Sequence, residues 1–531
     1  MKMPNGLRLL LCFGAAILFS LWCAGGAHAE GTPPAPPEQE TAAVEKSVVL
    51  RLRDVVARAL AANLDIAVEQ YNPAIRDAEL LSAKGVFDPT ITLEYSYSDE
   101  EIPQTTREGL ASNAGTTETI NKDLALTFSG LLASGTEYEV FFDRNQSQFS
   151  QRDVFDPVTL TFSDVRNQAQ YSLDLNFSVT QPILKDFGFD ANLADIRIAR
   201  TARTISIEDF RKRVIDTVAE VQSAYWDLVL TIENLRVTEA SLELAQDLLK
   251  ENRIRVEVGT MAALEVLQAE TGVAQREQEV IVSRSLIKDA EDNLKRLLNL
   301  LKDTEEWKLS IVPADEPEAI ERKVDLLTEL NLAIENRPDY KSSLLQVESD
   351  EINESSARNQ LLPSFDLNGE YEFRAVDSEF HGAFDDIERG TSPSWLAGAT
   401  AEYPIGNREA KGNHRKAQLE KLQSEKEAEN LRLSIIVEVK KAVRDIDTSL
   451  KVLEVARKAV ELAEESLKAE RKKLEVGVST SHDVLQFEEE LTDARRREIV
   501  AKTGYRKSLV GLAAATGAIL KENNIVVDET L

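Results

Sequence analysis

The stretch EVGTMAALEVLQAE (residues 257–270) returns in the second half of the chain as EVGVSTSHDVLQFE (residues 475–488). The two stretches lie 218 positions apart. Each contains a Val-Gly pair at which a helix can end in the left-handed conformation, and Thr260 or Thr480 can then cap the helix that follows. The sequence therefore predicts two helical hairpins whose turns have similar sequences.

Long helical patterns lead into both turns. No proline occurs from Ala191 to Val258, and an apolar residue recurs every seven positions, which is typical of a coiled-coil seam. At 1.5 Å per residue, an ascending helix of about 65 residues is roughly 100 Å long, which no compact globular domain requires. The seam positions are Val214, Val221, Leu228, Leu235, Leu242, Leu249 and Val256 in the first half, and Val439, Ile446, Leu453, Val460, Leu467 and Leu474 in the second.

The parts of the chain before the hairpins also match each other. An offset of 274 positions places Asp65 on Asp339 and Pro89 on Pro363. The two offsets differ by 56 residues, which indicates an internal duplication with an insertion among the first-half strands. The expected parts are a first repeat (46–300), a connector (301–325), a second repeat (326–520) and a C-terminal tail (521–531).

Four segments alternate apolar and polar residues with period two, which predicts strands with one oily and one polar face. Trp395 and Tyr403 bracket the last of them and, at ~3.3 Å per residue, lie roughly 26 Å apart, close to the spacing of the aromatic girdles of a membrane barrel. A soluble sandwich strand alternates in the same way, but the predicted export and the acidic polar faces favour a membrane wall. The segments are 90–97, 171–180, 365–373 and 395–403.

Two further short segments, Leu124–Phe128 and Tyr138–Phe142, predict an extra hairpin within residues 122–148. We expect the wall to keep four strands per chain and the rest of the insertion to lie in loops. Neither four nor six strands reach the eight of the smallest membrane barrels, and lipid does not tolerate open sheet edges. Closure therefore requires several chains.

The N-terminus has the pattern of a secretory signal peptide over residues 1–29, cleaved after Ala29. An uncleaved anchoring helix is the weaker alternative because the apolar run is short. Cys23 offers a lipid-anchoring alternative, although Trp22 precedes it where a small residue is expected. The only other cysteine, Cys12, lies in the same segment, so the mature chain has no disulfide. A proline-rich leader (30–45) follows.

The formal net charge of −30 becomes −32 when the basic residues of the signal are removed. Such acidity argues against nucleic acid as a partner. The four histidines form no triad or metal constellation and no phosphate-binding glycine loop is present, so we expect no enzyme activity, catalytic residue, bound metal or cofactor.

The shared turns have a local explanation as helix ends, but that does not explain why both halves carry the same turn. A common binding surface does. Asp483 has two interpretations: it complements the positive end of the returning helix, or it faces a pore at its narrowest end.

Taken together, the residues resemble the TolC-type outer-membrane efflux family over nearly the whole mature chain. The resemblance rests on an ordered, duplicated set of motifs rather than on any single one. These are Asn336-Arg337-Pro338-Asp339, Leu362-Pro363, Gln181-Pro182-Ile183-Leu184, Ala224-Tyr225-Trp226-Asp227-Leu228 and Glu257-Val258-Gly259-Thr260 followed by Glu265-Val266-Leu267-Gln268-Ala269.

The resemblance implies an α+β membrane protein. It implies a homotrimer whose transmembrane β-barrel, four strands per chain, continues into a long α-helical coiled-coil barrel. It also implies that the turns dock a periplasmic adaptor protein coupled to an inner-membrane pump. The matching tip residues are Val258, Gly259, Thr260, Val476, Gly477 and Val478. In the family's best-known member an Arg and two Asp lock the entrance; here Asp483 matches the first Asp, while Ser479 and Gln486 replace the others.

The function implied is a passive exit duct of a tripartite efflux or type I secretion system, in the outer membrane of a Gram-negative bacterium and extending into the periplasm. The sequence does not identify the cargo, which can be small molecules, metal ions or proteins. The alternative from another class is a periplasmic coiled-coil scaffold that tethers envelope layers and conducts nothing. That alternative explains the heptads and the export signal but not the strands with polar faces.

Overall fold

The computed structural model describes residues 47–103, 115–156, 158–300, 307–318 and 321–527. The chain divides into two units, 1–45 and 46–531, and every described element belongs to the second. The predicted signal peptide, the proline-rich leader and both cysteines lie outside the described residues.

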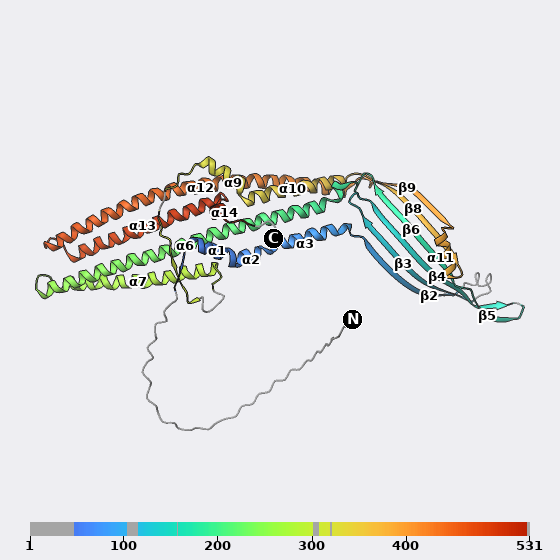
Figure 1. Ribbon diagram of the computed structural model, residues 1–531, viewed down its shortest axis with the longest axis horizontal. Coiled ribbons are helices and arrows are strands. Elements are labelled where there is room, and N and C mark those ends of the chain that lie inside the picture. Colours follow the sequence, from blue (N-terminus) through green and yellow to red (C-terminus); the bar gives the residue numbers. More distant parts are fainter. Residues whose placement is uncertain (1–46, 104–114, 157, 301–306, 319–320, 528–531) are drawn as a thin grey trace, which may run out of the picture. The chain divides into compact units, whose positions relative to one another are not determined.

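Two long helical hairpins dominate the described part (Figure 1). The ascending helices α6 and α12 have 64 and 68 residues, so each is roughly 100 Å long, as predicted, and each returning helix, α7 or α13, has 35. None of the described helices is both long and apolar enough to cross a bilayer. The bounds are α1 (Leu52–Ala62), α2 (Leu64–Glu69), α3 (Tyr71–Lys84), η1 (Gly85–Phe87), α5 (Phe189–Asn192), α6 (Ala194–Glu257), α7 (Ala263–Leu297), α9 (Leu326–Asn336), α10 (Pro338–Asn359), α11 (Phe380–Arg389), α12 (Arg408–Glu475), α13 (Ser481–Ala515) and α14 (Ile519–Glu522).

The predicted seam is buried along much of α12 but along only part of α6. In α6, Val214, Val221 and Leu228 are buried, whereas Leu235, Leu242 and Leu249 are half-buried. Beyond Leu228 the buried line moves to another face of the helix with smaller and more polar residues, because α6 packs against both α7 and α13. These residues are Thr238, Ser241, Ala245, Leu248 and Asn252.

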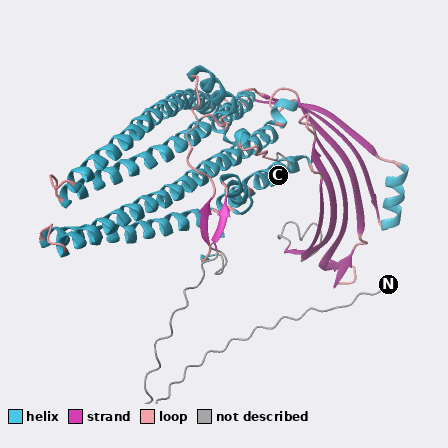
Figure 2. Ribbon diagram, turned by 60° about the vertical axis from the view of Figure 1, so that its left-hand side comes forward, coloured by secondary structure: helices cyan, strands magenta, loops and turns pink. Residues whose placement is uncertain are grey.

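Seven strands form one sheet, in which neighbouring strands are antiparallel (Figure 2). Its order is β2-β3-β4-β6-β8-β9, with β5 paired to the end of β4. The bounds are β2 (Thr90–Pro103), β3 (Thr116–Leu131), β4 (Glu137–Asp156), β5 (Thr161–Arg166), β6 (Gln170–Pro182), β8 (Ser364–Asp377) and β9 (Pro393–Glu402). A separate two-stranded parallel sheet joins β1 (Ser47–Leu50) to β7 (Ser310–Pro313).

The expectation that the rest of the insertion lies in loops is wrong, because the extra hairpin belongs to the chain's own seven-stranded sheet. The extra hairpin forms β3 and β4, of 16 and 20 residues, between β2 and β6. The apolar alternation looked shorter because Lys122 and Arg144 occupy the oily face. The Arg144 guanidinium lies 5.5 Å from the ring centres of Tyr171 and Phe380, a cation–π contact that accommodates the charge there.

The largest core lies where α1, α6, α7, α13 and α14 meet, around Tyr225. The Tyr225 hydroxyl donates to the Asp315 carboxylate at 2.8 Å, and burial raises the pKa of the phenol. The neighbouring Trp226 packs edge-on against the Tyr225 ring, and the Arg506 guanidinium lies 5.4 Å from the Trp226 ring centre. The Ala224-Tyr225-Trp226 motif is therefore a core element.

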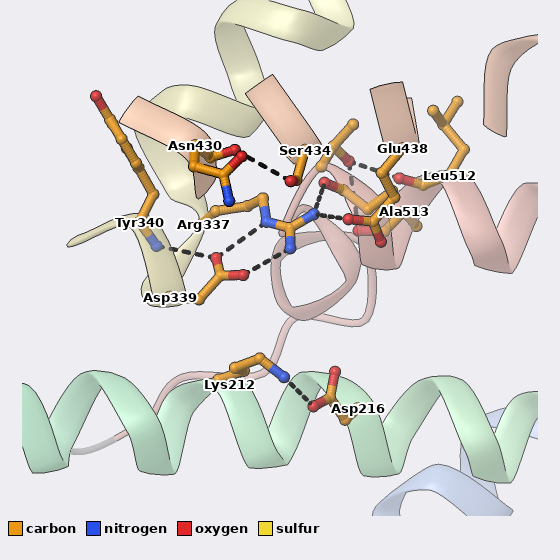
Figure 3. Close-up of polar contacts among 12 residues, drawn as sticks. Lys212, Asp216, Arg337, Asp339, Tyr340, Asn430, Ser434, Glu438, Leu512 and Ala513 are labelled. Carbon is orange, nitrogen blue, oxygen red and sulfur yellow. Dashed lines mark hydrogen bonds and ion pairs between the residues drawn. The ribbon is translucent and has the colours of Figure 1, made fainter. Parts of the chain in front are cut away.

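A second motif, Asn336-Arg337-Pro338-Asp339, fastens the start of α10 to its neighbours (Figure 3). Arg337 donates two hydrogen bonds to Asp339, at 2.6 and 3.0 Å. It also donates to Glu438 of α12 at 2.5 Å and to the Ala515 carbonyl at the end of α13 at 3.2 Å. One guanidinium thus ties the short helices α9 and α10 to the second hairpin.

Candidate functional site

The two hairpin turns have the same backbone geometry. Gly259 and Gly477 have φ of +77° and +79°, in the left-handed region. In the first turn, the amide of Gly259 donates to the Val256 carbonyl at 3.0 Å, and the amide of Thr260 donates to the Arg255 carbonyl at 2.9 Å. The amides of Gly477 and Val478 repeat this pattern with Leu474 and Lys473, at 3.2 and 3.0 Å. Both turns are therefore Schellman ends, as the glycines predict.

The side chains at the turns point into open space. Val258, Val476 and Val478 are 72–73% exposed. A Cβ placed on Gly259 or Gly477 would meet no heavy atom within 4 Å. The two tips thus expose small apolar side chains beside a backbone that a partner can approach. Such a surface is suited to contact with another molecule.

The helices after the two turns begin differently. The Thr480 hydroxyl accepts from the Asp483 amide at 3.3 Å, and the Asp483 carboxylate accepts from the Thr480 amide at 3.1 Å, which makes a capping box. Thr260 does not cap α7: its hydroxyl donates back to the Arg255 carbonyl at 3.0 Å, and Ala262 is the N-cap. The capping prediction is confirmed for Thr480 and wrong for Thr260, because Thr260 lies two residues before the N-cap position of α7.

Asp483 and Gln486 lie on the first turns of α13. Hydrogen bonds from the Thr480 hydroxyl and amide lower the pKa of Asp483, so its carboxylate is charged at neutral pH. The Gln486 side chain is exposed and donates to Glu490 at 3.3 Å. Three positions apart on one helix, the two side chains share a face.

Just behind the tips, buried polar groups hold the two hairpins together. The Asn252 amide of α6 donates to the Ser481 hydroxyl of α13 at 3.0 Å, and both residues are fully buried. The Ser481 amide donates to the Glu265 carboxylate of α7 at 3.1 Å. This contact was not predicted from the sequence; a polar residue at an inward heptad position, such as Asn252, is the signal that could have indicated it.

The main sheet has two chemically distinct faces. One registered row crosses all six long strands and is apolar throughout: Ile91, Phe128, Val140, Phe177, Tyr371 and Trp395. Several of its members are exposed, Ile91 by 71% and Trp395 by 77%. An exposed apolar band of this extent marks contact with a partner or with lipid.

The opposite face is polar and largely acidic. Asp174 pairs with Arg374 at 2.6 Å, Asp123 accepts from Ser96 at 2.9 Å, and Glu372 accepts from Ser394 at 3.1 Å. Among the described residues, no group of three or more His, Cys, Asp or Glu side chains is placed to hold a metal ion.

The two predicted interface aromatics lie at the edge of this sheet. Trp395 is near the start of the edge strand β9 and is registered with Tyr371. Tyr403 directly follows the last residue of β9 and is 51% exposed. Trp395 lies on the face that carries the apolar row.

The family model described as "Outer membrane efflux protein" matches residues 137–300 and 330–518. The chain belongs to this family, as its resemblance indicates. Membership of this family makes it an efflux protein of the outer membrane. The scaffold alternative is not favoured. No curated protein sequence matches the chain.

Solved structures share the fold at low sequence identity. The CmeC outer membrane channel of Campylobacter jejuni is 17% identical with a TM-score of 0.62, covering 90% of each chain. The outer membrane protein VceC of Vibrio cholerae is 16% identical with a TM-score of 0.61, covering 88% of this chain and 96% of that one. The open state of the Neisseria gonorrhoeae MtrE channel is 15% identical with a TM-score of 0.58, covering 88% and 89%.

Proposed function

We propose that three copies of this chain form one passive exit duct, in which the sheets close a barrel in the outer membrane and the hairpins continue it as a periplasmic tube. The observation that carries the proposal is the two-faced sheet. Its edge strands β2 and β9 are exposed and, within the described part of the chain, paired on one side only. Lipid does not tolerate such open edges, so they must pair with other copies.

The tube follows from an internal duplication of the chain. The repeats would span residues 46–300 and 326–520, joined by 301–325 and followed by a tail of 521–531. Equal element order supports this: in each half, strands lead to a helix of 64 or 68 residues, a glycine turn, and a helix of 35. Three chains would then bring six similar hairpins around one axis.

The hairpin tips serve as the docking surface for a periplasmic adaptor that couples the duct to an inner-membrane pump. Val258, Val476 and Val478 provide apolar contact, and Gly259 and Gly477 let a partner approach the backbone closely. Asp483 and Gln486, one turn behind the second tip, form the entrance gate. Trp395 and Tyr403 mark the two membrane interfaces.

Substitution of Gly259 and Gly477 by Leu tests the docking. Positive φ makes each leucine strained by about 1–2 kcal/mol, and its bulk obstructs the tip. We expect heat-modifiable trimers to form in the outer membrane while export in an efflux assay falls to background. The matched control is Gly406→Leu, because Gly406 also has positive φ and open space but lies beside the sheet. Normal export by the Gly259/Gly477 variant would refute docking at these turns.

A further inference from the structure

The hairpin β3–β4 carries the same two faces as the strands on either side of it. Its apolar side contributes Phe128 and Val140 to the row that runs from Ile91 to Trp395. Its polar side contributes Ala125 and Asp143 to the neighbouring row, which comprises Glu94, Ala125, Asp143, Asp174 and Arg374. A hairpin in an external loop has no reason to continue both faces, so β3 and β4 meet the same surroundings as β2 and β6 do.

The number and direction of the strands allow the sheet to close between copies. Six strands lie on the continuous path from β2 to β9, and each is antiparallel to the next. An even number makes the two edge strands run in opposite directions. The edge strand β2 of one copy is therefore antiparallel to β9 of a neighbouring copy that is related by rotation. The hydrogen-bond ladder of the sheet can then continue across the boundary between the two copies.

The stagger of the sheet is also compatible with closure. The register carries Thr90, the first residue of β2, across the sheet to Leu396 of β9. The end of β9, Glu402, lies six residues further along. If the next copy's Thr90 pairs with Glu402, the stagger is one residue for each strand. At 3.3 Å per residue and 4.8 Å between strands, the strands tilt by roughly 35°, the tilt that membrane barrels have.

We propose that the outer-membrane wall is an 18-stranded barrel, six strands from each of three copies, with β3 and β4 as full members. This rests on the proposed trimer and goes beyond it, since the family resemblance alone implies four strands per chain. The backbone of such a barrel is roughly 34 Å across, against roughly 22 Å for twelve strands at the same tilt. The strand section is then wider than four strands per chain would make it.

Cysteine accessibility tests the position of the hairpin, because both cysteines of the chain lie in the predicted signal peptide. Leu126→Cys and Ala125→Cys lie on the apolar and polar faces of β3. Leu175→Cys and Asn176→Cys are the matched controls on β6, which is a wall strand whether the wall has twelve or eighteen strands. A water-soluble maleimide is applied to outer membranes that contain each variant, and heat-modifiable trimers are scored in parallel.

We expect the maleimide to label Leu126→Cys as slowly as Leu175→Cys, at a rate at least tenfold below that of Ala125→Cys. Ala125→Cys should be labelled at the same rate as Asn176→Cys. Equal labelling of both β3 cysteines in membrane-embedded trimers, with the β6 controls still distinct, would overturn the 18-stranded wall and leave the proposed duct standing. A protein without trimers, with all four positions labelled equally, would overturn both.

Discussion

At the scale of residues, the backbone conformation at the two hairpin turns could be predicted from the sequence. A glycine that follows a long helical pattern predicts a left-handed helix end, and Gly259 and Gly477 both provide one. The Asn252–Ser481 contact could not be predicted in the same way, because it depends on how two hairpins more than 200 residues apart pack together. Local signals fix caps and turns; buried polar contacts need the tertiary arrangement.

The Arg337–Asp339 pair gives a prediction about pH. Burial raises the pKa of Asp339, but the hydrogen bonds and charge of Arg337 outweigh it, and the net shift is downward from 3.8. A carboxyl whose folded pKa is depressed stabilises the fold above the unfolded pKa, and this contribution is lost as pH falls through the folded pKa. We expect Asp339→Asn to cost about 2 kcal/mol at pH 7, since a charge-assisted hydrogen bond is lost.

Thermal unfolding of the detergent-extracted protein at pH 7 and pH 3 measures this. The melting temperatures of the wild type and Asp339→Asn should differ at pH 7 and converge toward pH 3. Glu429→Gln is the control, because Glu429 pairs with Lys426 on an exposed helix face where ion pairs contribute little. A difference that stays constant down to pH 3 would mean that the carboxylate charge is not what Arg337 needs.

At the scale of elements, the long helices and four of the strands were predictable because strong periodicity spans many residues. The hairpin β3–β4 was recognised only as two five-residue segments, since Lys122 and Arg144 interrupt its oily face. Its place in the sheet depends on how it pairs with the neighbouring strands, and this pairing cannot be predicted from the sequence of one segment. The seam of α6 was half predicted, because the same helix packs against both α7 and α13.

The start of α13 is the element at which the gate is testable. Asp483→Ala together with Gln486→Ala removes both proposed gate side chains, and we expect single-channel conductance in planar bilayers to rise severalfold. Because Asp483 also closes the capping box, the variant loses about 1 kcal/mol of helix stability. Thr480→Ala is the matched control: it breaks the same box but keeps the carboxylate. If Thr480→Ala raises conductance equally, fraying of α13 explains the effect and the gate assignment fails.

At the scale of the whole molecule, one chain exposes apolar surface and open sheet edges that it cannot cover by itself. The sheet exposes an apolar face and two unpaired edges, and the helical tips expose valines. Exposed apolar surface and open edges are costly in water, and open edges are costly in lipid as well. A ring of copies satisfies the edges, the bilayer covers the apolar face, and a periplasmic partner covers the tips.

The most direct test of this account is a cryo-electron microscopy map of the full-length protein extracted from outer membranes. We expect three copies around one axis, a closed strand barrel with β2 of each copy beside β9 of the next, and one continuous bore through the helical hairpins. A map with an open sheet, or with hairpins that enclose no bore, would contradict it.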